Sequence, residues 1–252
     1  MHGIRGNLVF RRVFGDAFPS SSDLAIDLCR KGGVSSSSQL IHLGSGLGSV
    51  SSIISQKFGC AVSGVEVVDK LVESSSSEWT SSNLEFQCAQ LDSAPFPDAW
   101  GTHILIESRL SSSTNPHRIL NEANRLLSDG GTMMSSEIII NDEEKLHPTS
   151  MDFLARMRPD FDYSLSSWNA LLESNDFDVL QMDEEPRIMK NNATKLRRAL
   201  LGARLLRRTG RLNLNEFGLG EFEDNFDEIA SRTLQAMESG AISYASFISK
   251  RF

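Results

Sequence analysis

The sequence predicts an α/β fold in which a doubly wound, mostly parallel sheet carries helices on both faces. Three observations support this prediction. Short apolar runs alternate with helical patterns between about residues 40 and 140, a spacing typical of parallel strands joined by crossover helices. A glycine-rich turn, Gly44 to Gly48, separates the first apolar run from the first helical pattern. The second run ends on an acidic residue, Glu66.

Composition and charge narrow the class of protein. The chain has 252 residues, of which 40% are hydrophobic and 23% charged, which is ordinary for one globular domain with a full core. Its net charge of −8 argues against nucleic-acid binding. We expect neither a transmembrane segment nor a signal peptide, because no apolar run is long enough. Three widely spaced cysteines predict a reducing, cytoplasmic setting without a metal site.

The glycine turn indicates which kind of ligand the domain binds. It reads Gly44-Ser45-Gly46-Leu47-Gly48, and Ser49 stands where a dinucleotide fingerprint would have Gly or Ala. Glycines let the backbone approach a ligand closely and direct the following helix N-terminus at it. Glu66, at the end of the second strand, can accept hydrogen bonds from both hydroxyls of a ribose. Two alternatives stay open: a glycine turn of another α/β protein, and a nicotinamide oxidoreductase, which Ser49 disfavours.

These residues resemble the class I S-adenosylmethionine (SAM) methyltransferases, in particular the small-molecule enzymes of the type 11 group. The resemblance covers about residues 14–140 and recurs at five separated motifs, among them the turn from Arg125 to Gly131. It implies a Rossmann-like sheet of seven strands, the last antiparallel, SAM as the cofactor and a small molecule as the methyl acceptor.

The resemblance also implies roles for individual residues. The backbone at the turn approaches the methionine part of SAM, Glu66 takes the ribose hydroxyls, and Val67 lies beside the adenine. Gln90 and Leu91 occupy the place where the family binds the adenine amino group, and Glu107 ends the fourth strand facing the transferred methyl. The implied cofactor-binding set is Gly44, Ser45, Gly46, Gly48, Glu66, Val67, Gln90, Leu91 and Glu107.

Three positions depart from the family pattern, because His42, Gln90 and Thr102 stand where acids are usual. Gln90 can still accept a hydrogen bond through its amide oxygen. His42 cannot simply replace a carboxylate near the cationic end of SAM. An alternative function is therefore a methyltransferase-like binding or scaffold protein that has lost catalysis.

The candidates for a catalytic role are Glu107, Tyr163 and His117. Tyr163 lies in a segment expected on the substrate side, and His117 follows Asn115-Pro116 at an expected helix start. His103 falls within the fourth strand, and we expect it to be a packed core group.

The ends of the chain carry two further expected features around the single domain, residues 1–252. Residues 1–33 are expected to form an N-terminal flap and helix, capped by Asp23, which covers the active site or packs on the core. Residues 186–239 are expected to form a helical lid between the last two strands, Phe177–Met182 and Ile242–Ile248. Its basic helix, residues 195–208, lies on an anionic membrane or substrate, or is neutralised by the acidic segment that follows it.

Overall fold

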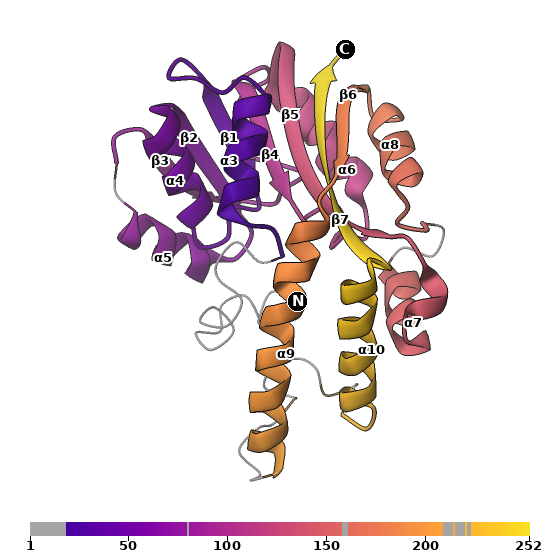
Figure 1. Cartoon of the computed structure of the whole chain (residues 1–252). Coiled ribbons are helices and arrows are strands. Elements are labelled where there is room, and N and C mark those ends of the chain that lie inside the picture. Colours follow the sequence, from indigo (N-terminus) through magenta and orange to yellow (C-terminus); the bar gives the residue numbers. More distant parts are fainter. Residues whose placement is uncertain (1–18, 80, 158–160, 209–213, 215–219, 221–222) are drawn as a thin grey trace.

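The computed structural model describes residues 19–79, 81–157, 161–208, 214, 220 and 223–252. Its centre is one seven-stranded sheet in the order β3-β2-β1-β4-β5-β7-β6 (Figure 1). The strands are β1 (Gln39–Leu43), β2 (Ala61–Glu66), β3 (Leu84–Cys88), β4 (Gly101–Glu107), β5 (Leu127–Ile140), β6 (Phe177–Glu184) and β7 (Ile242–Arg251).

Strand pairing confirms the mostly parallel, doubly wound sheet. β1 pairs in parallel with both β2 and β4, whereas β7 is antiparallel to its neighbours β5 and β6. Leu43 at the end of β1 is opposite Val65 on one side and Ile106 on the other. The residues that follow these three, Gly44, Glu66 and Glu107, are therefore brought to one edge of the sheet.

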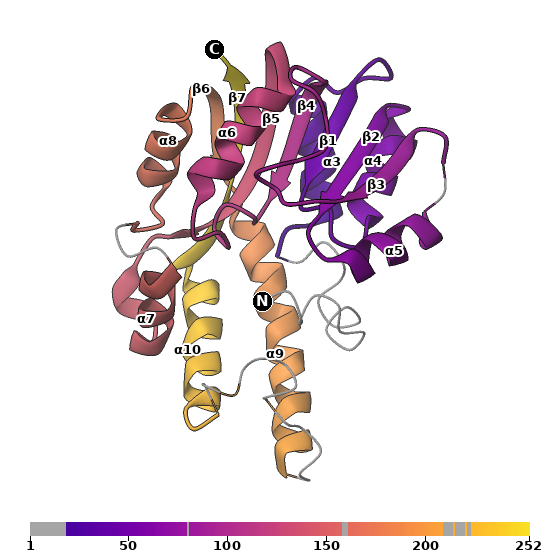
Figure 2. The same cartoon turned by 180° about the vertical axis from the view of Figure 1, so that it is seen from behind.

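Helices cover both faces of the sheet. α3, α4 and α9 lie on the face seen in Figure 1, and α6 and α8 lie on the face seen in Figure 2. The described helices are α3 (Ser22–Lys31), α4 (Ser49–Phe58), α5 (Asp69–Glu78), α6 (Pro116–Leu126), α7 (Pro148–Met157), α8 (Leu165–Glu173), α9 (Pro186–Arg208) and α10 (Phe226–Ser239), with the 3₁₀ turn η1 (Glu143–Lys145).

The sheet separates two apolar clusters, as a period-2 strand pattern requires. On β4, Ile104 and Ile106 pack with α6 and α8, while Leu105 packs with α3 and α4. The largest buried side chain of the first cluster is Trp168 of α8, whose indole Nε1 donates to the carbonyl of Ile138 at 3.0 Å. Both faces of the central strands are thus buried, which leaves only the strand ends for binding.

Side chains cap the N-termini of α3 and α6, and the cap of α3 differs from the residue predicted from the sequence. Ser21, and not Asp23, caps α3, because its hydroxyl accepts from the backbone N–H of Leu24 at 3.2 Å. Asp23 lies in the first turn, where its charge complements the helix dipole. Asn115 caps α6 ahead of Pro116, as the order of these residues predicts.

The segment between β6 and β7 contains α9 and α10, which extend side by side beyond the carboxyl edge of the parallel strands (Figures 1 and 2). Arg197 of α9 pairs with Glu238 of α10, and Arg204 Nε lies 2.9 Å from Asp227 Oδ1. The basic helix therefore has acidic partners on its neighbour. Of the expected N-terminal flap, residues 1–18 lie outside the described part of the chain.

Close packing beside the glycine turn gives a stability prediction. A Cβ at Gly64 of β2 would come within 2.5 Å of the Phe86 ring. We expect Gly64→Ala to lower the free energy of unfolding by about 1–3 kcal/mol, through overpacking. Urea denaturation measures the change. Gly202→Ala is the control, because this α9 glycine has open space around it, and it should stabilise the protein by roughly 0.5–1 kcal/mol. An unchanged free energy of unfolding in Gly64→Ala would contradict the packing argument.

Candidate functional site

The glycine turn after β1 is held against the end of β2. The backbone N–H groups of Gly44 and Ser45 both donate to the carbonyl of Val65, at 2.8 and 3.0 Å. Gly44, Gly46 and Gly48 have φ angles of 84°, 58° and 78°, a left-handed backbone that favours glycine. A Cβ at Gly46 would meet nothing within 4 Å. The turn thus has open backbone at Gly46, where a ligand can lie close.

Glu66, the last residue of β2, binds across to this turn through four hydrogen bonds. Its Oε2 accepts from the backbone N–H of Gly46 at 3.1 Å and from Arg109 Nη2 at 2.6 Å. Its Oε1 accepts from the N–H groups of Val67 and Val68, at 2.9 and 3.3 Å. An ionised carboxylate has about four acceptor positions. The carboxylate of Glu66 is therefore fully engaged.

Arg109 is the residue that completes the site. It follows β4, is buried, and donates from Nε and Nη2 to the carbonyl of Gly44, at 3.2 and 2.9 Å. Together with the Glu66 contact, these bonds stretch the side chain across the ends of β1 and β2. A Cβ placed on Gly44 would lie 2.1 Å from Arg109 Nε, so the guanidinium rests directly on the Gly44 backbone.

Glu66, which the sequence predicts as a ribose ligand, is buried. Only 1% of the residue is exposed. An ion pair buried to this extent costs several kcal/mol to break when one partner is removed, because the other charge stays behind uncompensated. Glu66 thus stabilises the fold and is also a candidate cofactor-binding residue.

A second buried acid, Glu137 of β5, fixes the backbone of the loop that carries Arg109. Its two carboxylate oxygens accept from the N–H groups of Leu110 and Ser111, at 3.0 and 2.9 Å. Ser108 turns the chain here with a φ of 52°, and its N–H donates to the carbonyl of Ser136 at 2.8 Å. Complete burial raises the pKa of Glu137 to about 7, against the lowering effect of these hydrogen bonds.

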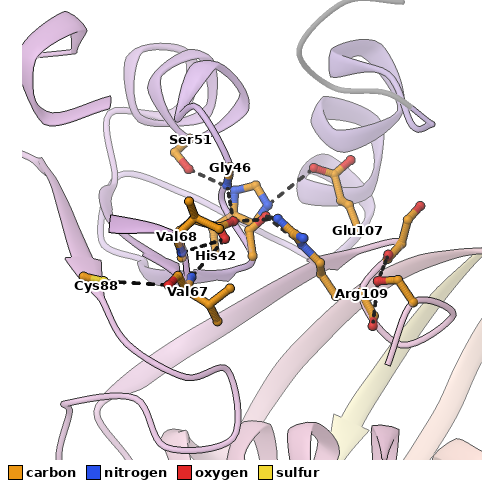
Figure 3. A network of polar contacts seen from close by, with 12 residues as sticks. His42, Gly46, Ser51, Val67, Val68, Cys88, Glu107 and Arg109 are labelled. Carbon is orange, nitrogen blue, oxygen red and sulfur yellow. Dashed lines mark hydrogen bonds and ion pairs between the residues drawn. The ribbon is translucent and has the colours of Figure 1, made fainter. Parts of the chain in front are cut away.

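His42 lies between α4 and β4, one residue before the end of β1 (Figure 3). Its Nδ1 is 2.9 Å from Ser51 Oγ, and its Nε2 is 3.5 Å from Glu107 Oε2. Burial, and secondarily the charge of Arg109, lower the pKa of His42 to about 3. The imidazole is therefore neutral near pH 7. A proton on Nε2 suits both neighbours, since Ser51 then donates to Nδ1 and Nε2–H points at the carboxylate.

The other residues predicted for cofactor binding lie at the same edge of the sheet. Val67 follows β2, and its carbonyl accepts a weak bond from Cys88 Sγ at 3.9 Å (Figure 3). Gln90 is exposed just after β3, and the partly buried Leu91 packs on the core next to it. Their roles toward adenine stay predictions, as does the role of Glu107 toward the methyl group.

The two other catalytic candidates lie apart from the glycine turn in their described contacts. Tyr163 is buried in an aromatic cluster, with its ring edge-on to Phe161 at a centroid distance of 5.1 Å. His117 is exposed in the first turn of α6, and its Nδ1 is within 3.2 Å of the Asn175 amide. Neither contact involves Glu66, Glu107 or Arg109, and a catalytic role for either residue stays a prediction.

Thr102, one of the departures from the family pattern, and its neighbour His103 both make local hydrogen bonds. Thr102, at the start of β4, accepts from the N–H of Gln39 at 2.9 Å and donates to its carbonyl at 3.3 Å, at the opposite edge from the turn. His103 Nε2 is 3.1 Å from the carbonyl of Gly32, and the pKa of His103 is lowered mainly by burial.

Sequence reasoning missed Arg109 and Glu137. A signal for each is visible in the chain. Arg109 follows the acid that ends an apolar strand, and Glu137 is a lone acid inside the apolar fifth strand. A charge in such a place is almost always paired or hydrogen-bonded.

Comparison with known proteins finds one sequence model that matches part of this chain. Residues 41–135 match the sequence model described as "Methyltransferase domain". A search of curated protein sequences finds no significant match.

Solved structures share the fold at low sequence identity. A candidate sarcosine dimethylglycine methyltransferase from Galdieria sulphuraria superposes with a TM-score of 0.76 and 14% identity, over 99% of this chain and 97% of that one. The geranyl diphosphate C-methyltransferase of Streptomyces coelicolor A3(2) was solved with Mg²⁺, geranyl diphosphate and S-adenosyl-L-homocysteine. It superposes with a TM-score of 0.66 and 14% identity, over 98% of this chain and 87% of that one. The [4+2]-cyclase SpnF superposes with a TM-score of 0.66 and 14% identity, over 91% of this chain and 81% of that one.

Residues 41–135 therefore match a methyltransferase domain, and the chain shares its overall fold with solved methyltransferase structures. The turn, Glu66 and the end of β4 all lie inside the matched residues. Two negative findings concern only the described part of the chain. None of its helices is long and apolar enough to cross a membrane. None of its groups of His, Cys, Asp and Glu side chains is suited to holding a metal ion.

The raised pKa of Glu137 predicts a specific pH dependence of stability. A carboxyl whose pKa is higher in the folded state, about 7, than in the unfolded state, about 4.3, stabilises the fold at low pH. This contribution is present below the unfolded pKa and is lost as the pH rises through the folded one. We expect the stability of the wild type relative to Glu137→Gln to fall by roughly 3 kcal/mol between about pH 4.5 and pH 7.

Urea unfolding of both proteins across this pH range measures the difference. Glu73→Gln, which changes an exposed acid on α5, is the control and should leave the pH dependence nearly unchanged. A flat difference between the wild type and Glu137→Gln would show that Glu137 titrates as it does in the unfolded chain.

Proposed function

We propose that the protein is a SAM-dependent methyltransferase acting on a small-molecule acceptor. The observation that carries the proposal is the placement of Glu66. Its carboxylate, at the end of β2, accepts a hydrogen bond from the N–H of Gly46 at 3.1 Å. A ribose lying along the turn would therefore lie next to this carboxylate. The family match over residues 41–135 supports the same reading.

When bound, SAM supplies a methyl group on a sulfonium, which is a good leaving group for an in-line displacement. The chain's task is to hold the acceptor in line with that methyl and to remove a proton where the acceptor has one. The turn from Gly44 to Gly48 would hold the methionine part, Glu66 the ribose, and Val67, Gln90 and Leu91 the adenine. Glu107, whose carboxylate is 3.5 Å from His42 Nε2, is the candidate to face the acceptor.

The residues of the turn fit this cofactor, whereas Glu66 does not while Arg109 is bonded to it. The open backbone at Gly46 is free to meet a ligand. The carboxylate of Glu66, by contrast, is saturated while Arg109 donates to it. This contact favours a second candidate function, a methyltransferase-like binding protein in which Arg109 permanently replaces the cofactor.

The helices between β6 and β7 support a lid and not a membrane anchor. The pairs Arg197–Glu238 and Arg204–Asp227 neutralise part of the basic face within the chain. The extension of α9 and α10 beyond the strand ends that carry the turn (Figure 1) suits a cover for the acceptor. All three cysteines are free thiols, which supports a reducing, cytoplasmic setting.

Isothermal titration with S-adenosylhomocysteine tests the proposal directly. Binding at micromolar to millimolar concentration supports an enzyme, and so does SAM or its demethylated product carried through purification. No binding at millimolar ligand would remove the methyltransferase function and leave the second candidate.

Variants of Glu66 test whether this carboxylate grips the ribose. We expect Glu66→Ala to lose about 2–4 kcal/mol of binding free energy, roughly 30- to 1,000-fold in affinity, because two charge-assisted hydrogen bonds disappear. Glu66→Gln should lose less, since its amide oxygen still accepts. The melting temperature of Glu66→Ala without ligand should also fall, because Arg109 is left buried without its partner.

Asp69→Ala is the matched control, since Asp69 is an exposed acid in the first turn of α5. It should change the affinity by less than about threefold, which amounts to under 1 kcal/mol. Equal affinity in the wild type and Glu66→Ala would show that the acid at the end of β2 does not bind the ribose.

A further inference from the structure

The side chain of Arg109 occupies two positions that the cofactor would use. It donates to Glu66 Oε2 at 2.6 Å and to the carbonyl of Gly44 at 2.9 and 3.2 Å. We propose that Arg109 is an internal competitor of SAM and sets the cofactor affinity of the protein. Its guanidinium holds the ribose position in the free protein and leaves before the cofactor binds. The inference rests on the proposed function, because it concerns the same site.

The first argument is the hydrogen-bonding capacity of Glu66. Three of its four bonds come from the backbone N–H groups of Gly46, Val67 and Val68, which belong to the turn and to the strand end. Those donors are backbone groups and cannot leave unless the turn or the end of β2 unfolds. The bond from Arg109 is the only one of the four made by a side chain. A ribose hydroxyl can therefore reach the carboxylate only in place of Arg109.

The second argument is space. A Cβ on Gly44 would lie 2.1, 2.5 and 2.7 Å from Arg109 Nε, Cγ and Cδ. The arginine thus covers the Gly44 backbone, which the glycine pattern keeps bare for the methionine part of SAM. A Cβ on Gly46, two residues further on, would meet no atom within 4 Å. The turn is therefore closed at one glycine, by a side chain, and open at the next.

The third argument is that the guanidinium can leave while the loop stays in place. The loop backbone is fixed by Glu137, through Leu110 and Ser111, and by the bond from Ser108 to Ser136. In the described part of the chain, the guanidinium itself bonds only to Glu66 and Gly44. Rotation about the side-chain torsions of Arg109 therefore frees the position.

Competition of this kind lowers the apparent affinity by the fraction of molecules in which the position is free. Removing the guanidinium should therefore tighten cofactor binding. If Arg109 were only structural, its removal would not tighten cofactor binding. If Arg109 held the carboxylate of the cofactor, its removal would weaken binding, because the variant would lose a contact made in the complex.

The experiment is isothermal titration of S-adenosylhomocysteine into the wild type, Arg109→Met, Arg109→Lys and a control, Arg118→Met. Methionine keeps an unbranched apolar side chain without the guanidinium donors, and lysine keeps the charge without the two hydrogen bonds to Gly44. Arg118 is an exposed arginine of α6, paired with Asp92 at 2.8 Å. Melting temperatures with and without ligand are recorded for all four proteins.

We expect Arg109→Met to bind at least tenfold more tightly than the wild type, and Arg109→Lys to fall between them. Arg118→Met should bind within twofold of the wild type. The free Arg109→Met protein should melt at a lower temperature, since Glu66 loses its ion pair, and saturating ligand should raise its melting temperature more than that of the wild type.

Two results overturn the inference. Measurable binding by the wild type with equal or weaker binding by Arg109→Met refutes competition and leaves the proposed function standing. Absence of binding by the wild type and by both Arg109 variants removes the proposed function and the inference together. Binding by Arg109→Met alone supports competition by Arg109 and favours the second candidate function, a site that its own arginine keeps closed. If Arg109→Met does not fold, the same comparison is made with Arg109→Lys.

Discussion

The carboxylate of Glu66 ties together the ends of three neighbouring strands. It closes β2, accepts from the turn that follows β1, and holds the arginine that follows β4. A buried carboxylate is stable only when its acceptor positions are filled and its charge is balanced. The turn, the loop from Ser108 to Ser111 and the position of Arg109 all meet this requirement. Whatever binds at this edge has to preserve the same balance.

Much of this edge follows from local sequence pattern. The glycine turn requires a left-handed backbone at Gly44, Gly46 and Gly48, and the structure has it there. An acid ending an apolar run, placed one helix after such a turn, predicts Glu66 at the adjacent strand end, because parallel neighbours share an edge. The seven-stranded, mostly parallel sheet was predictable for the same reason, since alternating strands and helices allow few other arrangements.

The contacts that decide the chemistry were not predictable in this way. Arg109 meets Glu66 only because β4 crosses to lie beside β1, a pairing between segments far apart in the chain. The pattern around Glu66 is that of a strand end facing solvent, and nothing local shows that a guanidinium covers it. Similarly, the family pattern around His42 predicts the loss of a cofactor contact. In the fold His42 lies between Ser51 and Glu107 and links α4 to β4.

The fold alone does not choose between methyl transfer and another chemistry. SpnF, named for a [4+2] cyclisation, and the geranyl diphosphate C-methyltransferase share this architecture at equal TM-scores of 0.66. The choice therefore depends on the charges at the strand ends. Near pH 7 His42 is neutral, and Arg109 is the cation in contact with Glu66. A ligand that displaces this guanidinium leaves the nearby acids in excess unless it brings a positive charge. A ligand with a cationic group, such as the sulfonium of SAM, would balance the charge of those acids.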